Sequence, residues 1–158
     1  TGQVDVITGW VIDAPQMAAV GPDARAFLLW DMGIRLYAFT YFTTDEVLKT
    51  RSEMLADFLG ASAKGWEWAA DHQEEAVDIV LKYAKDLKRD LEVATWKRET
   101  PFLWSDKTKT NGWAWMEASV WDDAIKVYSD LGLLKAPVTS KDTMTQDILQ
   151  RVDGRPKR

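Results

Sequence analysis

The first third of this chain has the residue pattern of β-strands and the rest has the pattern of α-helices, and this asymmetry limits the folds open to it. Three segments with strand-like patterns lie at residues 3–10, 24–30 and 36–43; the first is rich in β-branched residues, the second is mostly apolar and the third is rich in aromatic residues. The third is apolar on both faces, as interior strands of α/β sheets are. Three strands make too small a sheet to be covered on both faces, so we expect further strands upstream.

Helical patterns dominate after residue 43. Side chains at capping-box spacing, with Glu three residues later, occur at Thr43, Thr50 and Asp71. Apolar residues at helical spacing predict helices through 54–70, 76–84, 87–95 and 116–131, and a short helix within 140–150. A further short helix at 16–20 follows Asp13, a good N-cap residue. Strands followed by helices predict an α/β fold.

Composition excludes several classes of site and partner. The 158 residues include no cysteine, which rules out disulfides, thiol nucleophiles and cysteine-ligated metals. Lys and Arg number 20 against 25 Asp and Glu, so the formal charge is −5 and nucleic acid is not an expected partner. No apolar stretch approaches the roughly 18 residues of a membrane span. The chain starts Thr-Gly-Gln without a leader, so we expect any targeting segment to lie outside this sequence.

Several motifs, taken in order, resemble a known family. They are Gly2 to Trp10, Leu36 to Tyr41, the run Ala-Ser-Ala-Lys-Gly-Trp-Glu-Trp-Ala at 61–69, and Glu-Glu-Ala-Val at 74–77. Over roughly residues 1–135, their order and spacing resemble the later half of ABC-importer substrate-binding proteins for nitrate, sulfonate, taurine and thiamine pyrimidines.

The resemblance implies two α/β lobes around a cleft, with the chain crossing between the lobes twice. This chain would be a partial periplasmic-binding-protein-like structure, with three early strands followed by a helical C-terminal part. Residues 1–36 would belong to the second lobe, and residues 37–150 would supply the crossover strand and the helices of the first lobe. Residues 151–158 would form a flexible tail, and the N-terminal half of the usual chain would be missing.

Thr8, Gly9 and Trp10 lie where the first predicted strand ends in a turn. Such strand ends expose backbone amides and side chains to ligands in open parallel sheets. Trp10 offers a flat stacking face, Thr8 a hydroxyl and Gly9 a close approach to the backbone. A buried Trp that seals the strand end explains the same residues, and the family resemblance favours the ligand role more than the pattern alone does.

Tyr37 and Tyr41 alternate with Phe39 along the third predicted strand, so we expect all three to project from one face. Core packing explains this stripe, but a crossover strand lines the cleft in the resembling family, which implies a ligand role for Tyr37 and Tyr41. Asp31 follows the second predicted strand and is a candidate partner for a cationic or amide-bearing ligand, although a turn-capping role is favoured.

No residue pattern indicates catalysis, a metal or a cofactor. His72 is the single imidazole, and Glu74 and Glu75 beside it lack the spacing of metal ligands. We interpret His72 as a solvated residue at a helix start. Five tryptophans in the second half are suited to stacking a ligand, wedging helices or joining copies of the chain, with helix packing favoured. They are Trp96, Trp104, Trp113, Trp115 and Trp121.

The leading hypothesis is the solute-binding component of an ABC importer, or a fragment of it, that binds a small organic solute or oxyanion in an interlobe cleft. It is not expected to be an enzyme or to hold a cofactor. Its partners would be the solute, the membrane permease, and either a second copy or the missing N-terminal half. The resemblance implies a periplasmic or extracellular protein, membrane-anchored at full length in some cases. The alternatives are an enzyme similar to thiamine-pyrimidine synthases, whose cysteine-rich motif is absent, and a helical interaction module.

Overall fold

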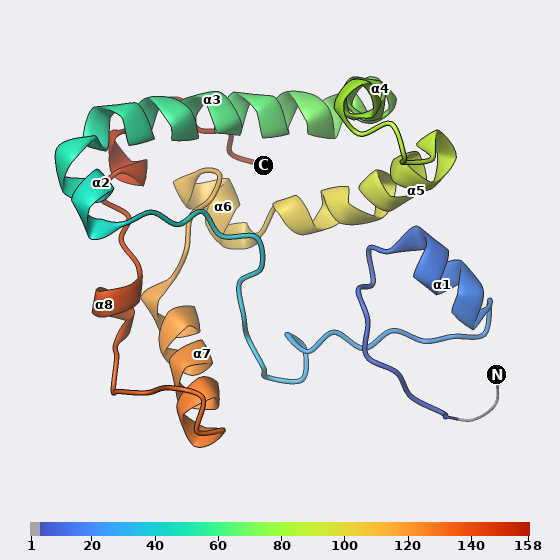
Figure 1. Cartoon of the computed structure of the whole chain (residues 1–158), viewed down its shortest axis with the longest axis horizontal. Helices are drawn as coiled ribbons and strands as arrows, with labels where there is room; N and C mark the ends of the chain where they lie inside the picture. Colours follow the sequence, from blue (N-terminus) through green and yellow to red (C-terminus); the bar gives the residue numbers. More distant parts are fainter. Residues whose placement is uncertain (1–3) are drawn as a thin grey trace. The chain divides into compact units, whose positions relative to one another are not determined.

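The computed structural model describes residues 4–158, and helices are the regular elements over that range (Figure 1). Gln3, where we predicted the first strand to begin, lies outside the described residues. The elements are α1 (Ala14–Val20), α2 (Asp45–Thr50), α3 (Ser52–Asp71), α4 (Gln73–Tyr83), α5 (Arg89–Glu99), η1 (Thr100–Leu103), α6 (Asp106–Asn111), α7 (Ala118–Asp130), α8 (Ser140–Thr143) and η2 (Leu149–Arg151).

The predicted α/β fold class is wrong, because no strand forms among residues 4–158. Residues 4–13 and 21–44 run without regular structure on either side of α1, and Figure 1 draws them as plain coil. Their backbone hydrogen bonds are local, such as Ile34 N–H to Leu29 O at 3.0 Å. Alternating β-branched and aromatic residues favour an extended backbone, but a strand needs a neighbour that pairs with its N–H and C=O groups. Within the described chain, residues 4–10, 24–30 and 36–43 do not pair with one another, so no strand forms.

The helical predictions are confirmed for the longer elements. The structure places α3, α4, α5 and α7 over the predicted segments, and Gly132, at φ +68°, follows the end of α7. The predicted short helix within 140–150 is divided into α8 and η2. Helices are the easier prediction because each backbone hydrogen bond joins residues only four apart.

The three caps predicted after residue 43 lie at the wrong residues. The N-cap of α4 is His72 and not Asp71. Thr44, with an extended backbone, accepts the N–H of Val47 at 3.2 Å and caps α2, one residue after the predicted Thr43. The Thr50 hydroxyl instead donates to the carbonyl of Glu46 at 2.7 Å, inside α2. Because a cap side chain reaches the N3 amide only from an extended conformation, the backbone decides which of two adjacent threonines serves.

The chain divides into two compact units, each built from two separate segments. Unit 1 comprises the described part of Thr1–Ala26 together with Trp66–Trp104, and unit 2 comprises Phe27–Gly65 with Ser105–Arg158. The long helix α3 contributes its first residues to unit 2 and its last to unit 1. The division at residue 36 that the resemblance implies remains a prediction about the lobes of the full protein.

Unit 1 is held together by packing among α1, α4 and α5. Val77 of α4 and Val93 of α5 are buried between these helices. The Trp96 ring lies 5.6 Å from the Trp66 ring, and its Nε1–H donates to the carbonyl of Ala69 at 2.9 Å. Trp96 therefore joins α5 to the end of α3 by both packing and a hydrogen bond, which agrees with the favoured packing interpretation.

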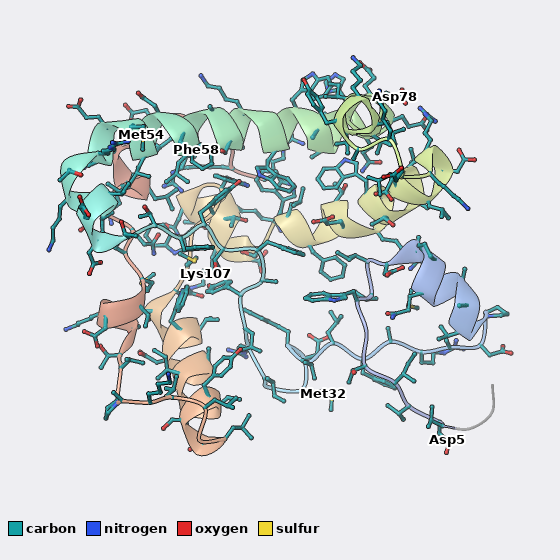
Figure 2. The ribbon with its side chains drawn as sticks, viewed as in Figure 1. Asp5, Met32, Met54, Phe58, Asp78 and Lys107 are labelled. Atoms are coloured by element: carbon teal, nitrogen blue, oxygen red, sulfur yellow. The ribbon has the colours of Figure 1, made fainter. Side chains whose placement is uncertain are left out.

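Ion pairs on the surface of unit 1 also link α4 with α5. Arg89 Nε lies 2.6 Å from Asp78 Oδ1, and Lys97 Nζ lies 3.2 Å from Glu74 Oε1. Asp78 projects from α4 (Figure 2). A hydrogen bond from Lys97 lowers the pKa of Glu74, and a hydrogen bond from Arg89 lowers the pKa of Asp78.

These two carboxylates predict a loss of stability in acid. Because their pKa values are lowered by folding, the unfolded state takes up more protons as the pH falls, and the stabilisation present near neutral pH is lost as each group is protonated. We expect the free energy of unfolding, measured with urea between about pH 7 and about pH 3, to fall less steeply in Glu74→Gln/Asp78→Asn. Glu75→Gln, an exposed neighbour, should keep the wild-type slope. Equal slopes in all three proteins would contradict the prediction.

The core of unit 2 is centred on Trp113, whose side chain is only 6% exposed. Val120 of α7 and the consecutive residues Ile148 and Leu149 are buried in the same unit. The Trp113 N–H donates to the carbonyl of Pro156 at 2.8 Å, and Arg155 Nη1 donates to the Trp113 carbonyl at 2.8 Å. The C-terminal residues that we expected to form a flexible tail thus make two hydrogen bonds with the residue at the centre of unit 2.

Gly112 is predicted to tolerate no side chain. It ends α6 at φ +90°, and a Cβ added there would lie 3.1 Å from Arg155 Cβ. We expect Gly112→Ala to lower the free energy of unfolding by about 1–2 kcal/mol, since a left-handed backbone is unfavourable for alanine. Gly65→Ala, in open space inside α3, should instead raise it by about 0.5–1 kcal/mol, because alanine is the better helix former. Urea unfolding measures both, and a shift of the same sign in the two variants would contradict the assignment.

Candidate functional site

The predicted turn Thr8-Gly9-Trp10 lies in unit 1, ahead of α1. The Trp10 N–H donates to Gln16 Oε1 at 3.0 Å, and Asp13 Oδ1 accepts the N–H of Gln16 at 2.8 Å. α1 therefore holds the turn through one glutamine. The Trp10 side chain is 61% exposed, so the alternative of a buried tryptophan sealing a strand end is wrong.

Gly9 has a different neighbour from the one we predicted. A Cβ built on Gly9 would lie 2.0 Å from Gln16 Oε1. The side chain of Gln16 thus makes the close approach to the backbone that we assigned to a ligand. The sequence Gly9-Trp10 by itself does not show whether a ligand or a side chain of the same chain lies against the glycine backbone.

Tyr37 is the most constrained of the predicted site residues. Its half-buried hydroxyl accepts the N–H of Glu117 at 2.9 Å, and burial raises the pKa of the phenol. The hydroxyl therefore stays protonated at neutral pH, and its proton has no acceptor among residues 4–158. The Glu117 carboxylate is paired with Lys107 of α6 at 2.9 Å (Figure 2 labels Lys107). Tyr37 is thus a fixed hydrogen-bond donor for any ligand acceptor that reaches it.

Trp30 lies against Tyr37 and was missed as a site residue. The two ring centroids are 6.1 Å apart, and the guanidinium carbon of Arg35 lies 5.8 Å from the Trp30 centroid. Part of the indole remains exposed. Trp30, Arg35 and Tyr37 together present a flat aromatic face, a cation and a hydroxyl. In the sequence Trp30 ends an apolar segment, a position equally typical of a core residue.

Tyr41 packs against Phe58 and Trp113. Its ring meets Phe58 of α3 edge-on, with centroids 5.5 Å apart, and lies 6.0 Å from the buried Trp113 (Phe58 is labelled in Figure 2). The face on which we placed Tyr37, Phe39 and Tyr41 together requires a strand, and Phe39 interrupts the extended backbone with φ +54°. Tyr41 therefore packs on the core of unit 2, whereas Tyr37 lies beside Trp30.

Asp31 lies in an exposed turn at residues 29–33, next to Met32 (Figure 2). Its N–H donates to the carbonyl of Leu28 at 3.1 Å, and its carboxylate has no partner among the described residues. The turn interpretation fits this position. Within unit 2 the Tyr37 ring lies beside Trp30, whereas the Tyr41 ring lies against Phe58 and Trp113.

The start of α4 has a hollow of about 520 Å³ that does not have the character of a ligand pocket. His72 lies there on the surface, as predicted, stacked on Trp68 with ring centroids 4.7 Å apart. Ligand pockets are mostly apolar with a few polar groups, whereas this lining is largely charged and polar. It comprises Ala70, Asp71, His72, Gln73, Glu74, Glu75 and Lys97.

The described residues provide neither a metal-binding cluster nor a membrane-spanning helix. Residues 4–158 contain no cluster of three or more His, Asp or Glu side chains arranged to hold a metal ion. Among the helices of that same range, none is both long and apolar enough to cross a bilayer.

Comparison with known proteins gives two matches. Residues 1–76 match the family described as NMT1/THI5 like. The chain is also 24% identical over 149 residues to the formylaminopyrimidine-binding protein of Halalkalibacterium halodurans. That match covers 92% of this chain and 45% of the relative, so the chain spans less than half the length of the curated relative it matches.

These matches support a solute-binding role for the protein of which this chain is a part. The relative is a binding protein and not an enzyme, which agrees with the expectation of a non-enzyme. The match of residues 1–76 to the family described as NMT1/THI5 like supports the resemblance drawn from the sequence motifs.

Proposed function

We propose that the protein to which this chain belongs binds a small, flat, nitrogen-containing aromatic solute of the pyrimidine type. The observation that carries this proposal is the match to a formylaminopyrimidine-binding protein along 92% of the chain. The exposed indoles of Trp10 and Trp30 support it, because a planar heteroaromatic ring stacks on such faces.

The candidate residues divide into stacking and hydrogen-bonding groups. In unit 2, Trp30 would stack on the solute, and the Tyr37 hydroxyl, fixed by Glu117, would donate to a ring nitrogen. In unit 1, Trp10 would be a separate candidate for stacking. The Thr8 hydroxyl would make a polar contact, and Asp31 would accept from an exocyclic amino group. Tyr41, seated on Phe58 and Trp113, would position the segment that carries Tyr37.

The same proposal covers the transport role. The solute would be bound in a cleft between the two lobes and passed to the membrane permease of an ABC importer, with the protein in the periplasm or outside the cell. Residues 1–36 would contribute to one lobe and residues 37–150 to the other. Because the chain spans 45% of its relative, full affinity would require the lobe surfaces that the rest of the protein supplies.

Calorimetric titration with formylaminopyrimidine, using the full-length protein and this chain in parallel, tests the proposal. We expect binding to the full-length protein, and Tyr37→Phe should weaken it about tenfold, since one hydrogen bond to the solute is lost. Tyr83→Phe, an exposed tyrosine in unit 1, serves as the matched control and should bind normally. Absence of binding to the full-length protein, or preference for nitrate or taurine over the pyrimidine, would overturn the proposed ligand class.

A further inference from the structure

Two dipeptides of unit 2, Asn111-Gly112 and Asp153-Gly154, have sequences that favour the formation of a succinimide ring. In this ring closure, the backbone nitrogen of the glycine attacks the side-chain carbonyl carbon of the residue before it. Glycine favours the reaction because it has no Cβ to hinder the attacking nitrogen. The two dipeptides flank one contact, since a Cβ added at Gly112 would lie 3.1 Å from Arg155 Cβ. Their local structures differ, and this difference decides which of them is able to react.

Asn111-Gly112 is protected by the end of α6. Asn111 is the last residue of this helix, and the Gly112 N–H donates to the carbonyl of Thr108 at 2.7 Å. Attack by the Gly112 nitrogen requires that this hydrogen bond be broken and the helix end opened. Gly112 is also buried. The folded structure therefore opposes ring closure at Asn111.

Asp153-Gly154 forms an exposed turn after η2 and has no such protection. The Gly154 N–H and the Asp153 carboxylate have no hydrogen-bond or ion-pair partner among residues 4–158. Gly154 has φ +67°, and a Cβ added there would meet nothing within 4 Å. Neither packing nor a backbone hydrogen bond holds the attacking nitrogen away from the carboxyl carbon.

We propose that Asp153 is a site of spontaneous isomerisation to isoaspartate in the folded protein. The Gly154 nitrogen forms a bond to Asp153 Cγ, and its proton leaves with the carboxyl hydroxyl as water. A second water then attacks the main-chain carbonyl carbon of Asp153 and breaks its bond to the Gly154 nitrogen, so that the chain now runs through Cγ. One water is lost and one is gained, and no further reactant is needed. The modification is independent of the solute-binding role.

Isomerisation lengthens the main chain immediately before the residues that bind Trp113. The Pro156 carbonyl accepts the Trp113 N–H at 2.8 Å, and Arg155 Nη1 donates to the Trp113 carbonyl at 2.8 Å. Isoaspartate adds one methylene carbon to the backbone ahead of both residues, which displaces them from this geometry. We therefore expect the Trp113 amide to lose protection from hydrogen exchange once Asp153 has isomerised.

Storage of the 158-residue chain at physiological pH and temperature, folded or in urea, tests the site. Endoproteinase Asp-N cleaves before aspartate and not before isoaspartate, and mass spectrometry of the peptides detects deamidation of Asn111. In urea we expect Asn111 to change first, because a side-chain amide is a better electrophile than an ionised carboxylate. Folding should lower the rate at Asn111 relative to Asp153 about a hundredfold and reverse this order, since only Asn111 requires local opening. Absence of isoaspartate at Asp153 from the stored folded chain, or change at Asn111 ahead of it, would overturn the site.

Asp153→Glu is the matched control. It keeps the charge, but its longer side chain would have to close a six-membered ring, which forms far more slowly. The stored variant should keep the fresh protein's hydrogen exchange at Trp113, whereas the isoaspartate fraction of the wild type should exchange there at least about tenfold faster. Unchanged exchange in that fraction would overturn the effect on the contact with Trp113.

Discussion

Replacement of Trp113 by alanine is expected to lower the free energy of unfolding by about 3–5 kcal/mol, the range for deletion of a large buried aromatic side chain. Trp113 has the most buried aromatic side chain in unit 2 and carries Tyr41 against its ring. Its removal leaves a cavity beside the C-terminal residues Arg155 and Pro156, which form hydrogen bonds with the Trp113 backbone. Trp113→Phe should cost less, since most of the apolar contact is retained.

Urea unfolding followed by far-ultraviolet circular dichroism measures this loss, and Phe27→Ala is the control. Phe27 belongs to the same unit but is 81% exposed, so its truncation should change stability by less than about 0.5 kcal/mol. A Trp113→Ala protein as stable as Phe27→Ala would show that the core of unit 2 lies elsewhere.

Trp96→Ala is expected to have the largest effect in unit 1, a loss of about 3 kcal/mol. The indole packs on Trp66 and its Nε1–H donates to the Ala69 carbonyl. Removal of the ring therefore separates α5 from the end of α3. Trp96→Phe retains a ring but deletes the donor, and it should lose about 1–2 kcal/mol because the Ala69 carbonyl is left without this partner.

The order of the two Trp96 variants distinguishes packing from hydrogen bonding. Phe102→Ala, an exposed aromatic residue of the same unit, should remain within about 1 kcal/mol of the wild type. If Trp96→Phe proves as stable as the wild type, the hydrogen bond to Ala69 contributes nothing. If Trp96→Ala matches Phe102→Ala, Trp96 is not a core residue.

Part of the candidate site was predictable from the sequence and part was not. Tyr37 was proposed from the aromatic stripe and the family resemblance and stays a prediction, and the structure holds its hydroxyl by the N–H of Glu117. Its partner Glu117 is 80 residues further along the chain, and no local pattern indicates that contact. Trp30 was missed for a similar reason, because its position at the end of an apolar segment is also typical of core residues.

The sequence by itself determined the longer helices, the acidic charge and the family resemblance. A helix satisfies its backbone within a single segment, so apolar spacing and a nearby breaker such as Gly132 are sufficient to locate it. The family motifs are likewise local, and the comparisons support what they indicated.

Only the tertiary structure decided whether strand-forming residues become strands and which aromatic residues meet. Residues 4–10 and 36–43 are rich in β-forming residues and residues 24–30 are mostly apolar. Their hydrogen-bonding partners in a sheet must come from other segments, and within the described chain these three segments do not pair. The choice of Gln16 as the neighbour of Gly9, and of Trp113 as the centre of unit 2, also depends on contacts between segments. Such contacts are decided by the shape and burial of the folded chain, which no short stretch of sequence contains.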